Sequence, residues 1–306
     1  MITLASGVSY IDLNFLGVRG VIATVVLHGS AGVALIDPGP TSALPVLRAN
    51  LERSGIAIGD LRTILLTHIH LDHAGATGTL VREQPALRVV VHEQGAPHMV
   101  NPEKLLASAS RLWPGEMDRL WGEFLPVPAE RLDVVKGGER ITAGGRDLEI
   151  QYTPGHANHH VSYFGADTGI AFVGDTAGIR LQGGGFVMPP TPPPDIDLDT
   201  WRDSLARIAA WHPSTLFVTH FGPHTAVEAH LAELSDHLAL TSGLVKASLA
   251  RDGTDEEREA WFADEVRRLL LRQMSASEAQ AYEVAGRFDL NWKGLARYWR
   301  KRDRGN

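Results

Sequence analysis

Short apolar runs alternate with helical patterns over the first two-thirds of the chain. Two runs rich in β-branched residues, at 21–27 and 32–36, flank a Gly-Ser turn and so predict a β-hairpin. The apolar run at 61–66 has the length of a strand that is covered on both faces. Further apolar runs predict strands at 87–91, 147–152, 161–164, 170–173 and 216–218. The pattern therefore predicts an α/β fold.

Helical and irregular segments separate these strands. A helical excursion at about 102–124 carries an apolar face, and we expect a segment of this size to cover another part of the protein. A Gly- and Pro-rich segment at 183–194 predicts a loop. Asp199 is the predicted N-cap of a helix that carries Trp201 and Leu205 on its apolar face.

After about residue 225 the strand signals end. A stripe of leucines within 231–238 and capping boxes at Thr254 and Ser275 predict helices. We therefore divide the chain into a β-rich body, residues 1–225, with the helical insertion, and a C-terminal helical region, residues 226–306. Because the apolar faces of these helices require burial, we expect them to pack beside the insertion and to shape a pocket. The same helices are a candidate homodimer contact.

The composition excludes several classes of protein. Of the 306 residues, 44% are hydrophobic and 21% are charged, which is typical of a globular protein and not of a disordered one. The chain has no cysteine, so any bound metal must be held by nitrogen and oxygen ligands. The net charge of −7 argues against a general nucleic-acid binder.

The location of the protein is predicted from the absence of two signals. The chain does not start with a basic segment followed by a long apolar run, and it lacks an apolar run long enough to span a membrane. We therefore expect a cytoplasmic protein without a membrane segment, which acts on a small molecule and not on nucleic acid.

A dense group of metal-ligand residues follows the apolar run at 61–66. His68, His70, Asp72 and His73 lie within six residues, where a strand ends and a helix begins. A buried group of three imidazoles and a carboxylate without a metal would incur a large desolvation cost. The two halves of the group face slightly different directions, which suits two adjacent metals.

Residues of the same kind follow other predicted strands. His156, Asp175 and His220 each come at the end of an apolar run, so one edge of the sheets gathers these three side chains. A carboxylate can bridge two cations, and Asp175 is the natural candidate for that position.

In order and kind, these seven residues resemble the ligand series of the metallo-β-lactamase fold superfamily, over about residues 20–225. The resemblance implies an αββα sandwich with two metals at one edge of two packed sheets. It also implies a first metal held by His68, His70 and His156, a second held by Asp72, His73 and His220, and Asp175 between them.

The resemblance extends to residues outside the ligand series. It implies that Asp37 organises the site, although a simple turn residue before Pro-Gly is an equal alternative. The segment 153–162 is similar to the glyoxalase II version of the fold, which implies that His160 orients a ligand, with structural packing as the alternative. His98, Arg111 and His224 are candidates to contact an anionic or carbonyl group of the substrate, and each is equally compatible with a solvated side chain.

The activity implied by the resemblance is metal-dependent hydrolysis of a small ester, thioester, lactone or phosphoester. Two divalent ions would activate a shared water as hydroxide, and Asp72 would orient this nucleophile and pass its proton to the leaving group. Zn²⁺ is expected, with Mn²⁺ or Fe²⁺ as alternatives, because imidazole and carboxylate discriminate weakly among them.

Two other activities remain open. One is oxidation by a single iron, as in persulfide dioxygenases that resemble glyoxalase II. The other is RNA processing, because the residues after His220 resemble those of tRNA 3′-processing members. Asp72, His73 and His220 favour two metals, and therefore hydrolysis.

Overall fold

The computed structural model describes residues 1–29, 31–181 and 185–305. Ser30 of the predicted turn and the first two residues of the predicted 183–194 loop lie outside the described residues. The described part of the loop contains a single bridge, between Ile179 and Met188, that ties it back to the chain before it.

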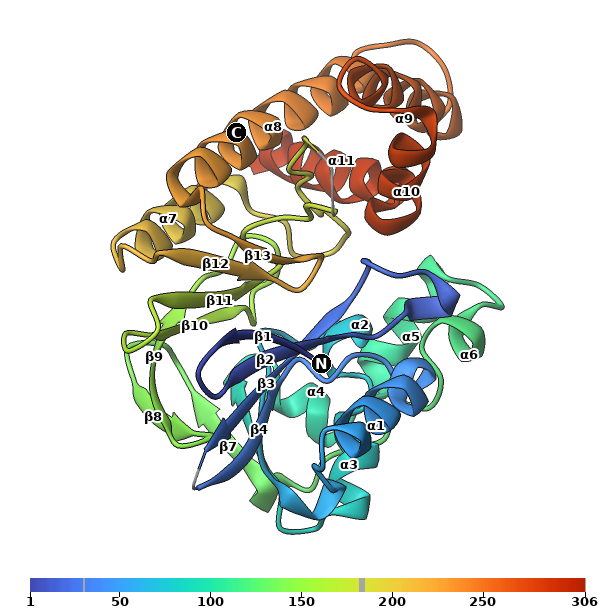
Figure 1. The fold of residues 1–306 in the computed structure, drawn as a ribbon. Helices are drawn as coiled ribbons and strands as arrows, with labels where there is room; N and C mark the ends of the chain where they lie inside the picture. The colour runs from blue at the N-terminus through green and yellow to red at the C-terminus, as the bar shows by residue number, and fades with distance from the viewer. Residues whose placement is uncertain (30, 182–184, 306) are drawn as a thin grey trace.

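The strands of the described residues form two sheets (Figure 1). The first sheet has seven strands in chain order: β1 (Ile2–Ala5), β2 (Val8–Asp12), β3 (Ala23–Gly29), β4 (Gly32–Ile36), β5 (Leu61–Leu65), β6 (Arg88–His92) and β7 (Leu132–Val135). The second has six, also in chain order: β8 (Arg140–Ala143), β9 (Arg146–Tyr152), β10 (Val161–Gly165), β11 (Ile170–Gly174), β12 (Thr215–Val218) and β13 (Gly222–His224).

Both sheets are mixed. In the first, β1 to β4 pair antiparallel and β4 to β7 pair parallel. In the second, only β11 and β12 are parallel among the described pairs. The parallel strands β5, β11 and β12 all end toward the same edge, which is where the sequence places its candidate ligands.

Helices cover the outer face of each sheet (Figure 1). The helices before the second sheet are α1 (Leu44–Arg53), α2 (Leu71–Ala74), α3 (Thr77–Glu83), α4 (Ala96–Val100), α5 (Glu103–Leu112) and α6 (Met117–Leu120). Helix α7 (Leu198–Ala209) connects β11 to β12, and the second sheet is followed by α8 (Val227–Leu249), α9 (Asp255–Leu271), α10 (Ala276–Gly286) and α11 (Phe288–Gly305). Short 3₁₀ turns lie at Phe15–Gly17, Thr41–Ala43, Ile58–Asp60 and Ala129–Arg131.

Three apolar cores hold these layers together. One lies between the sheets and includes Leu65, Ile150 and Phe172. A second joins the first sheet to α1, α3 and α5. A third joins the second sheet to α7 and to the C-terminal helices, with Trp201 and Leu234 fully buried in it. Helix, sheet, sheet and helix therefore form four layers, and the predicted αββα sandwich is confirmed.

Two expectations from the sequence need correction. The N-cap of α7 is Asp197 and not Asp199, because the Asp197 side chain accepts hydrogen bonds from the backbone N–H groups of Asp199 and Thr200. The C-terminal helices do not share an apolar core with the insertion. Their apolar faces bury into the core of the second sheet, whereas the insertion belongs to the core of the first.

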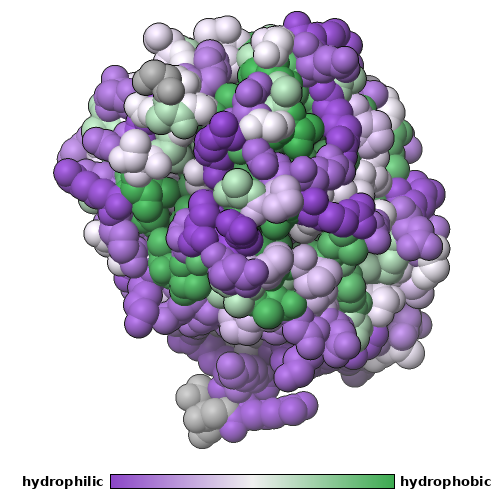
Figure 2. Space-filling view, turned by 90° about the horizontal axis from the view of Figure 1, so that it is seen from below, coloured by the Kyte–Doolittle hydropathy of each residue, from purple (hydrophilic) through white to green (hydrophobic). Residues whose placement is uncertain are grey.

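The surface shows no large apolar belt on the face that Figure 2 displays, where hydrophilic residues surround small, separate groups of hydrophobic ones. Among the described residues, no helix combines the length and apolar character that crossing a membrane requires.

The third core predicts a specific stability effect. Leu234→Ala removes a side chain with no exposed surface and should lower the free energy of unfolding by about 2–5 kcal/mol, through lost burial and a residual cavity. Leu240→Ala, on the same helix but 41% exposed, should change it by less than about 0.5 kcal/mol. Urea denaturation of both variants checks this; equal effects would mean that α8 is not part of the core.

Candidate metal centre

The turn after β5 is shaped by the buried carboxylate of Asp37. Its Oδ1 accepts the Thr67 backbone N–H at 2.8 Å, and its Oδ2 accepts the Thr67 hydroxyl at 2.7 Å. Asp37 itself adopts a left-handed φ of 51°, which an aspartate tolerates better than most residues. The turn then leads into α2, with His70 at its N-cap. His68 and His70 therefore lie on an irregular segment and not on a continuing strand.

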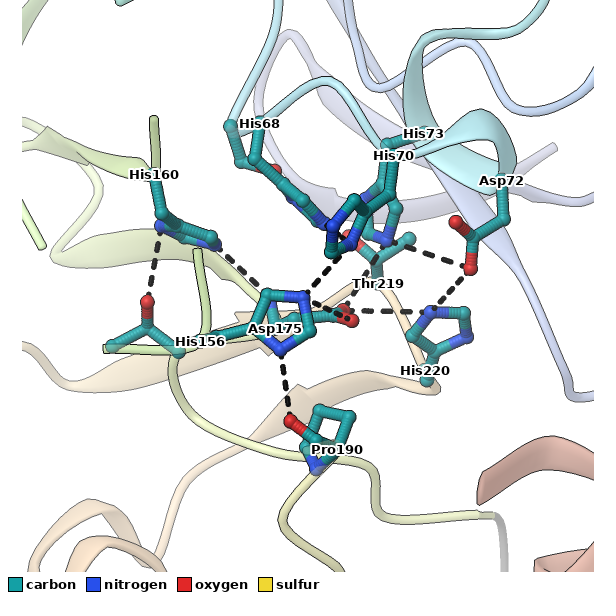
Figure 3. A network of polar contacts seen from close by, with 12 residues as sticks. His68, His70, Asp72, His73, His156, His160, Asp175, Pro190, Thr219 and His220 are labelled. Carbon is teal, nitrogen blue, oxygen red and sulfur yellow. Dashed lines mark hydrogen bonds and ion pairs between the residues drawn. The ribbon is translucent and has the colours of Figure 1, made fainter. Parts of the chain in front are cut away.

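Three ring nitrogens converge on one side of the site (Figure 3). Nε2 of His68 lies 3.0 Å from Nδ1 of His70, which lies 3.0 Å from Nε2 of His156. Three nitrogens bound tetrahedrally to a zinc ion would be about 3.3 Å apart. We call these residues the first group.

A second group faces the first. Oδ2 of Asp72 lies 3.4 Å from Nε2 of His220 and 3.8 Å from Nε2 of His73. In each group, the atoms able to bind a metal lie within 4.8 Å of one another.

Asp175 lies between the two groups, at the end of β11 (Figure 3). Its Oδ2 is 3.5 Å from Nε2 of His156 in the first group. Its Oδ1 is 3.3 Å from Nε2 of His73 and 3.4 Å from Nε2 of His220 in the second group. Each carboxylate oxygen thus faces a different group, which is the arrangement expected of a bridging ligand.

Hydrogen bonds on the far side of the rings fix which nitrogen faces inward. A ring N–H that donates outward leaves the other nitrogen with a lone pair for a metal. Three rings make such a bond through Nδ1. His156 donates to the Pro190 carbonyl at 2.8 Å, and His220 donates to the Val21 carbonyl at 2.7 Å. His73 donates to Asp37 Oδ2 at 2.8 Å.

Two buried atoms of the site fit a metal directly. His73 Nε2 and Asp175 Oδ1 have no hydrogen-bond partner among the described residues. Leaving a buried polar atom without a partner is costly, and a cation that takes the place of a proton on His73 Nε2 would satisfy both atoms. The donor set of imidazoles and carboxylates suits Zn²⁺, Mn²⁺ or Fe²⁺.

The two groups differ in their electrostatics. Burial lowers the pKa of His68 well below its ordinary value and, with the nearby His156, lowers that of His70 to about 3. Burial also acts on His73 and His220, but the charge of Asp175, with that of Asp72, outweighs it and raises the pKa of both rings. The rings of the first group therefore stay neutral to lower pH than an ordinary histidine, whereas His73 and His220 keep a proton to higher pH.

Two of the residues implied by the resemblance lie directly behind the ligands. Asp37 supports His73, as described above, and also accepts the Thr219 hydroxyl at 3.2 Å. His160 is fully buried, and its Nε2 accepts the Asp175 backbone N–H at 3.2 Å. Both positions are those of side chains that orient ligands.

The three candidate substrate residues lie elsewhere. Arg111 is exposed on α5, and neither it nor His98 on α4 is among the residues that line the cavity above the site. His224 on β13 packs against His230, with ring centroids 5.0 Å apart, and it also lies outside that cavity. The structure therefore does not bring these three residues to the site.

Some groups that shape the metal centre could not be found from the pattern of ligand residues in the sequence. The carbonyl groups of Val21 and Pro190 act through the backbone, and any residue type supplies one. Gly174 is different: a Cβ there would lie 2.5 Å from the Thr67 hydroxyl and 2.6 Å from His160 Nε2. A glycine directly before Asp175 is the sequence signal for this close approach.

The site opens into a cavity of about 940 Å³. Five of the seven candidate ligands line it: His70, Asp72, His156, Asp175 and His220. One wall comes from the insertion and the residues near Phe15, and the opposite wall comes from α9, α10 and the start of α11. The insertion and the C-terminal helices thus face one another across the cavity.

Comparison with known proteins agrees with this architecture. The sequence model of the metallo-beta-lactamase superfamily matches residues 16–220, and the chain belongs to that superfamily. It is 30% identical to the metallo-beta-lactamase fold-containing protein ST1585 of Sulfurisphaera tokodaii, over 70% of this chain and 78% of that protein. It is also 30% identical to the hydroxyacylglutathione hydrolase of Aeromonas hydrophila, over 60% of this chain and 54% of that enzyme.

A solved structure extends the likeness to the C-terminal helices. The metallo-beta-lactamase family protein TTHA1429 of Thermus thermophilus matches with a TM-score of 0.71 over 98% of this chain and 95% of that one. At 24% identity this likeness concerns the fold. The helices after β13 are therefore part of an arrangement that occurs in a related protein.

Removal of a ligand should release metal without unfolding the chain. We expect His70→Ala to lose the first-group metal and Asp175→Ala to weaken both, because the oxygens of Asp175 face both groups. His159→Ala is the matched control, since His159 is buried nearby but belongs to neither group. Metal analysis with circular dichroism checks this; full metal content in both ligand variants would refute the assignment.

The two groups should respond differently to pH. Because the pKa values of His73 and His220 are raised, protons compete with a metal more strongly at the second group, and its affinity should fall from pH 7.5 to 5.5, by at most about 100-fold per displaced proton. Affinity at the first group should change little, because His68 and His70 are already neutral. Zn²⁺ titration calorimetry at both pH values measures this, and parallel weakening of the two sites would contradict it.

Proposed function

We propose that the protein is a hydrolase with two divalent metal ions, most simply Zn²⁺, that cleaves an ester, thioester, lactone or phosphoester bond of a small molecule. The observation that carries this proposal is the position of Asp175. Its two oxygens face two groups of buried donors, and the same carboxylate lines a cavity large enough for a small molecule.

When bound, the two ions would supply Lewis-acid activation of water and of the scissile carbonyl or phosphoryl group. The protein itself holds the metal-binding side chains in position. Asp37 accepts a hydrogen bond from His73, and the carbonyl groups of Val21 and Pro190 accept hydrogen bonds from His220 and His156. The inward nitrogens of these rings therefore do not need to reorient when a metal binds.

Asp72 is the residue that we propose moves a proton. Its side chain is 24% exposed, compared with 6% for Asp175, and it lines the cavity. Burial raises its pKa, but the charge of His73 and the hydrogen bond with His220 outweigh burial and bring it to about 2. Asp72 is therefore ionised at neutral pH and able to accept a hydrogen bond from the attacking water; we propose that it takes the proton of this water as the water attacks the substrate and then passes that proton to the leaving group.

The second group also bears on the alternative of a single-iron oxygenase. Such a site needs only three protein ligands, which two histidines of the first group and Asp175 could provide. Asp72, His73 and His220 would then be converging metal-ligand residues without a role, and His73 Nε2 would stay without a hydrogen-bond partner. This favours hydrolysis at two metals.

The test combines metal analysis with an activity panel. Protein purified without chelators should contain two zinc ions per chain and hydrolyse at least one member of a panel of esters, thioesters, lactones and phosphodiesters. Asp72→Asn should lower kcat by about 10²–10⁴-fold while first-group metal remains bound. Asp118→Asn, exposed on α6 and outside the cavity, is the control.

Two results would overturn the proposal. One is a single iron per chain with no hydrolysis of any panel member. The other is full turnover by the Asp72→Asn variant, which would remove Asp72 from the reaction.

A further inference from the structure

The cavity above the metal centre has a strongly apolar wall. The insertion and the N-terminal segment contribute Phe15, Leu105, Leu112, Trp113 and Trp121, and the rings of Phe15 and Trp121 stack with centroids 5.7 Å apart. Such a surface favours hydrocarbon over polar or charged groups, since each apolar group that leaves water for it gains free energy.

Apolar side chains also lie exposed around this cavity. Leu16 is 46% exposed and Val18 is 49% exposed on the N-terminal side, and Val284 of α10 is 62% exposed on the opposite side. All three line the cavity. Exposed apolar residues that gather on both walls of one cavity point to an apolar ligand more than scattered ones would.

The basic residues of the lining are already paired with carboxylates. Within the described residues, the cavity has two lysine or arginine side chains: Arg119, which is paired with Glu116, and Arg287, which is paired with Asp289 at 2.8 Å. No lining lysine or arginine is therefore left to receive the carboxylate or phosphate of a substrate.

Acidic residues dominate the far wall. Glu283 is paired with Arg267 at 2.7 Å and Glu259 with Lys293 at 3.4 Å, whereas Glu256 has no ion-pair partner within the described chain. An anionic substrate group that extends toward α9 would meet the unpaired charge of Glu256. A neutral group would not.

We infer that this cavity selects substrates with an extended apolar acyl group on an uncharged leaving group, and that it discriminates against acyl groups carried by anionic thiols such as glutathione or coenzyme A. The inference rests on the proposed hydrolase function and adds the substrate class. It separates this chain from the relatives named as hydroxyacylglutathione hydrolases, to which it is 26–30% identical.

A series of thioesters of a neutral thiol, N-acetylcysteamine, tests the acyl preference. Acyl chains of two to ten carbons should raise kcat/KM about three- to fourfold per methylene until the wall is covered, which is the effect of burying one CH₂ group. The same acyl chain on glutathione or coenzyme A should react at least tenfold more slowly. A flat series, or faster reaction of the anionic thioesters, would overturn the inference.

Two neighbouring leucines provide a matched pair of variants. Leu105 lines the cavity, whereas Leu106, on the same helix and similarly half-buried, does not. Leu105→Gln should flatten the dependence on chain length, and Leu105→Met should restore it. Leu106→Gln should leave the dependence unchanged. Equal flattening in both glutamine variants would mean that the wall acts only through stability.

A binding measurement separates this inference from the proposed function. Neutral primary amides of four to ten carbons are titrated calorimetrically into the full-length protein, and affinity should rise about three- to fourfold per methylene, less so in Leu105→Gln. If no panel substrate is hydrolysed but the amides bind with this trend, the proposed function fails, whereas the preference of the cavity for neutral apolar ligands stands. Hydrolysis without any chain-length trend in rate or binding refutes the substrate class alone.

Discussion

The arrangement of the protein depends on one constraint: the lone pairs of seven side chains from two sheets face the same small, buried space. Imidazoles of the first group converge within hydrogen-bond distance, and the carboxylates of Asp72 and Asp175 face the histidines of the second. Without cations, this concentration of acceptors is stable only if some histidines hold protons. The raised pKa of His73 and His220 and the lowered pKa of His68 and His70 are the two sides of that balance.

The fold meets this constraint through hydrogen bonds that hold the ligand residues on the side away from the metal positions. Asp37 joins three separate segments, because its carboxylate accepts hydrogen bonds from Thr67, His73 and Thr219. Through these contacts, the ends of β4, β5 and β12 are held together at the edge where the ligands lie. The second sheet contributes Asp175 in the same way, through the contact of its backbone with His160.

Much of the fold was predictable because its central strands are apolar runs. The run at 32–36 matches β4, and the runs at 61–66 and 170–173 match β5 and β11 to within one residue. Of the strands that the pattern missed, β1, β7, β8 and β13 lie at the edges of the sheets, and only β2 lies inside one. β13, for example, contains Pro223 and is a strand because it pairs with β12, which no local pattern reveals.

The candidate ligands were predictable from residue type and order, but their surroundings were not. Val21 and Pro190 contribute only carbonyl groups, and Arg111 and His98 have suitable chemistry but lie outside the lining of the cavity. The role of the C-terminal helices was predictable only in part. Their leucine stripe indicates burial, but only the structure shows that they bury against the second sheet and leave a cavity opposite the insertion.

The most direct test is anomalous diffraction at the zinc edge from crystals grown with Zn²⁺. The account predicts two peaks, one about 2.0–2.1 Å from the inward nitrogens of His68, His70 and His156, and one at the same distance from those of His73 and His220, with Asp175 between them. A single peak at the first group would contradict the claim of two metals, and no peak at either group would contradict the metal centre itself.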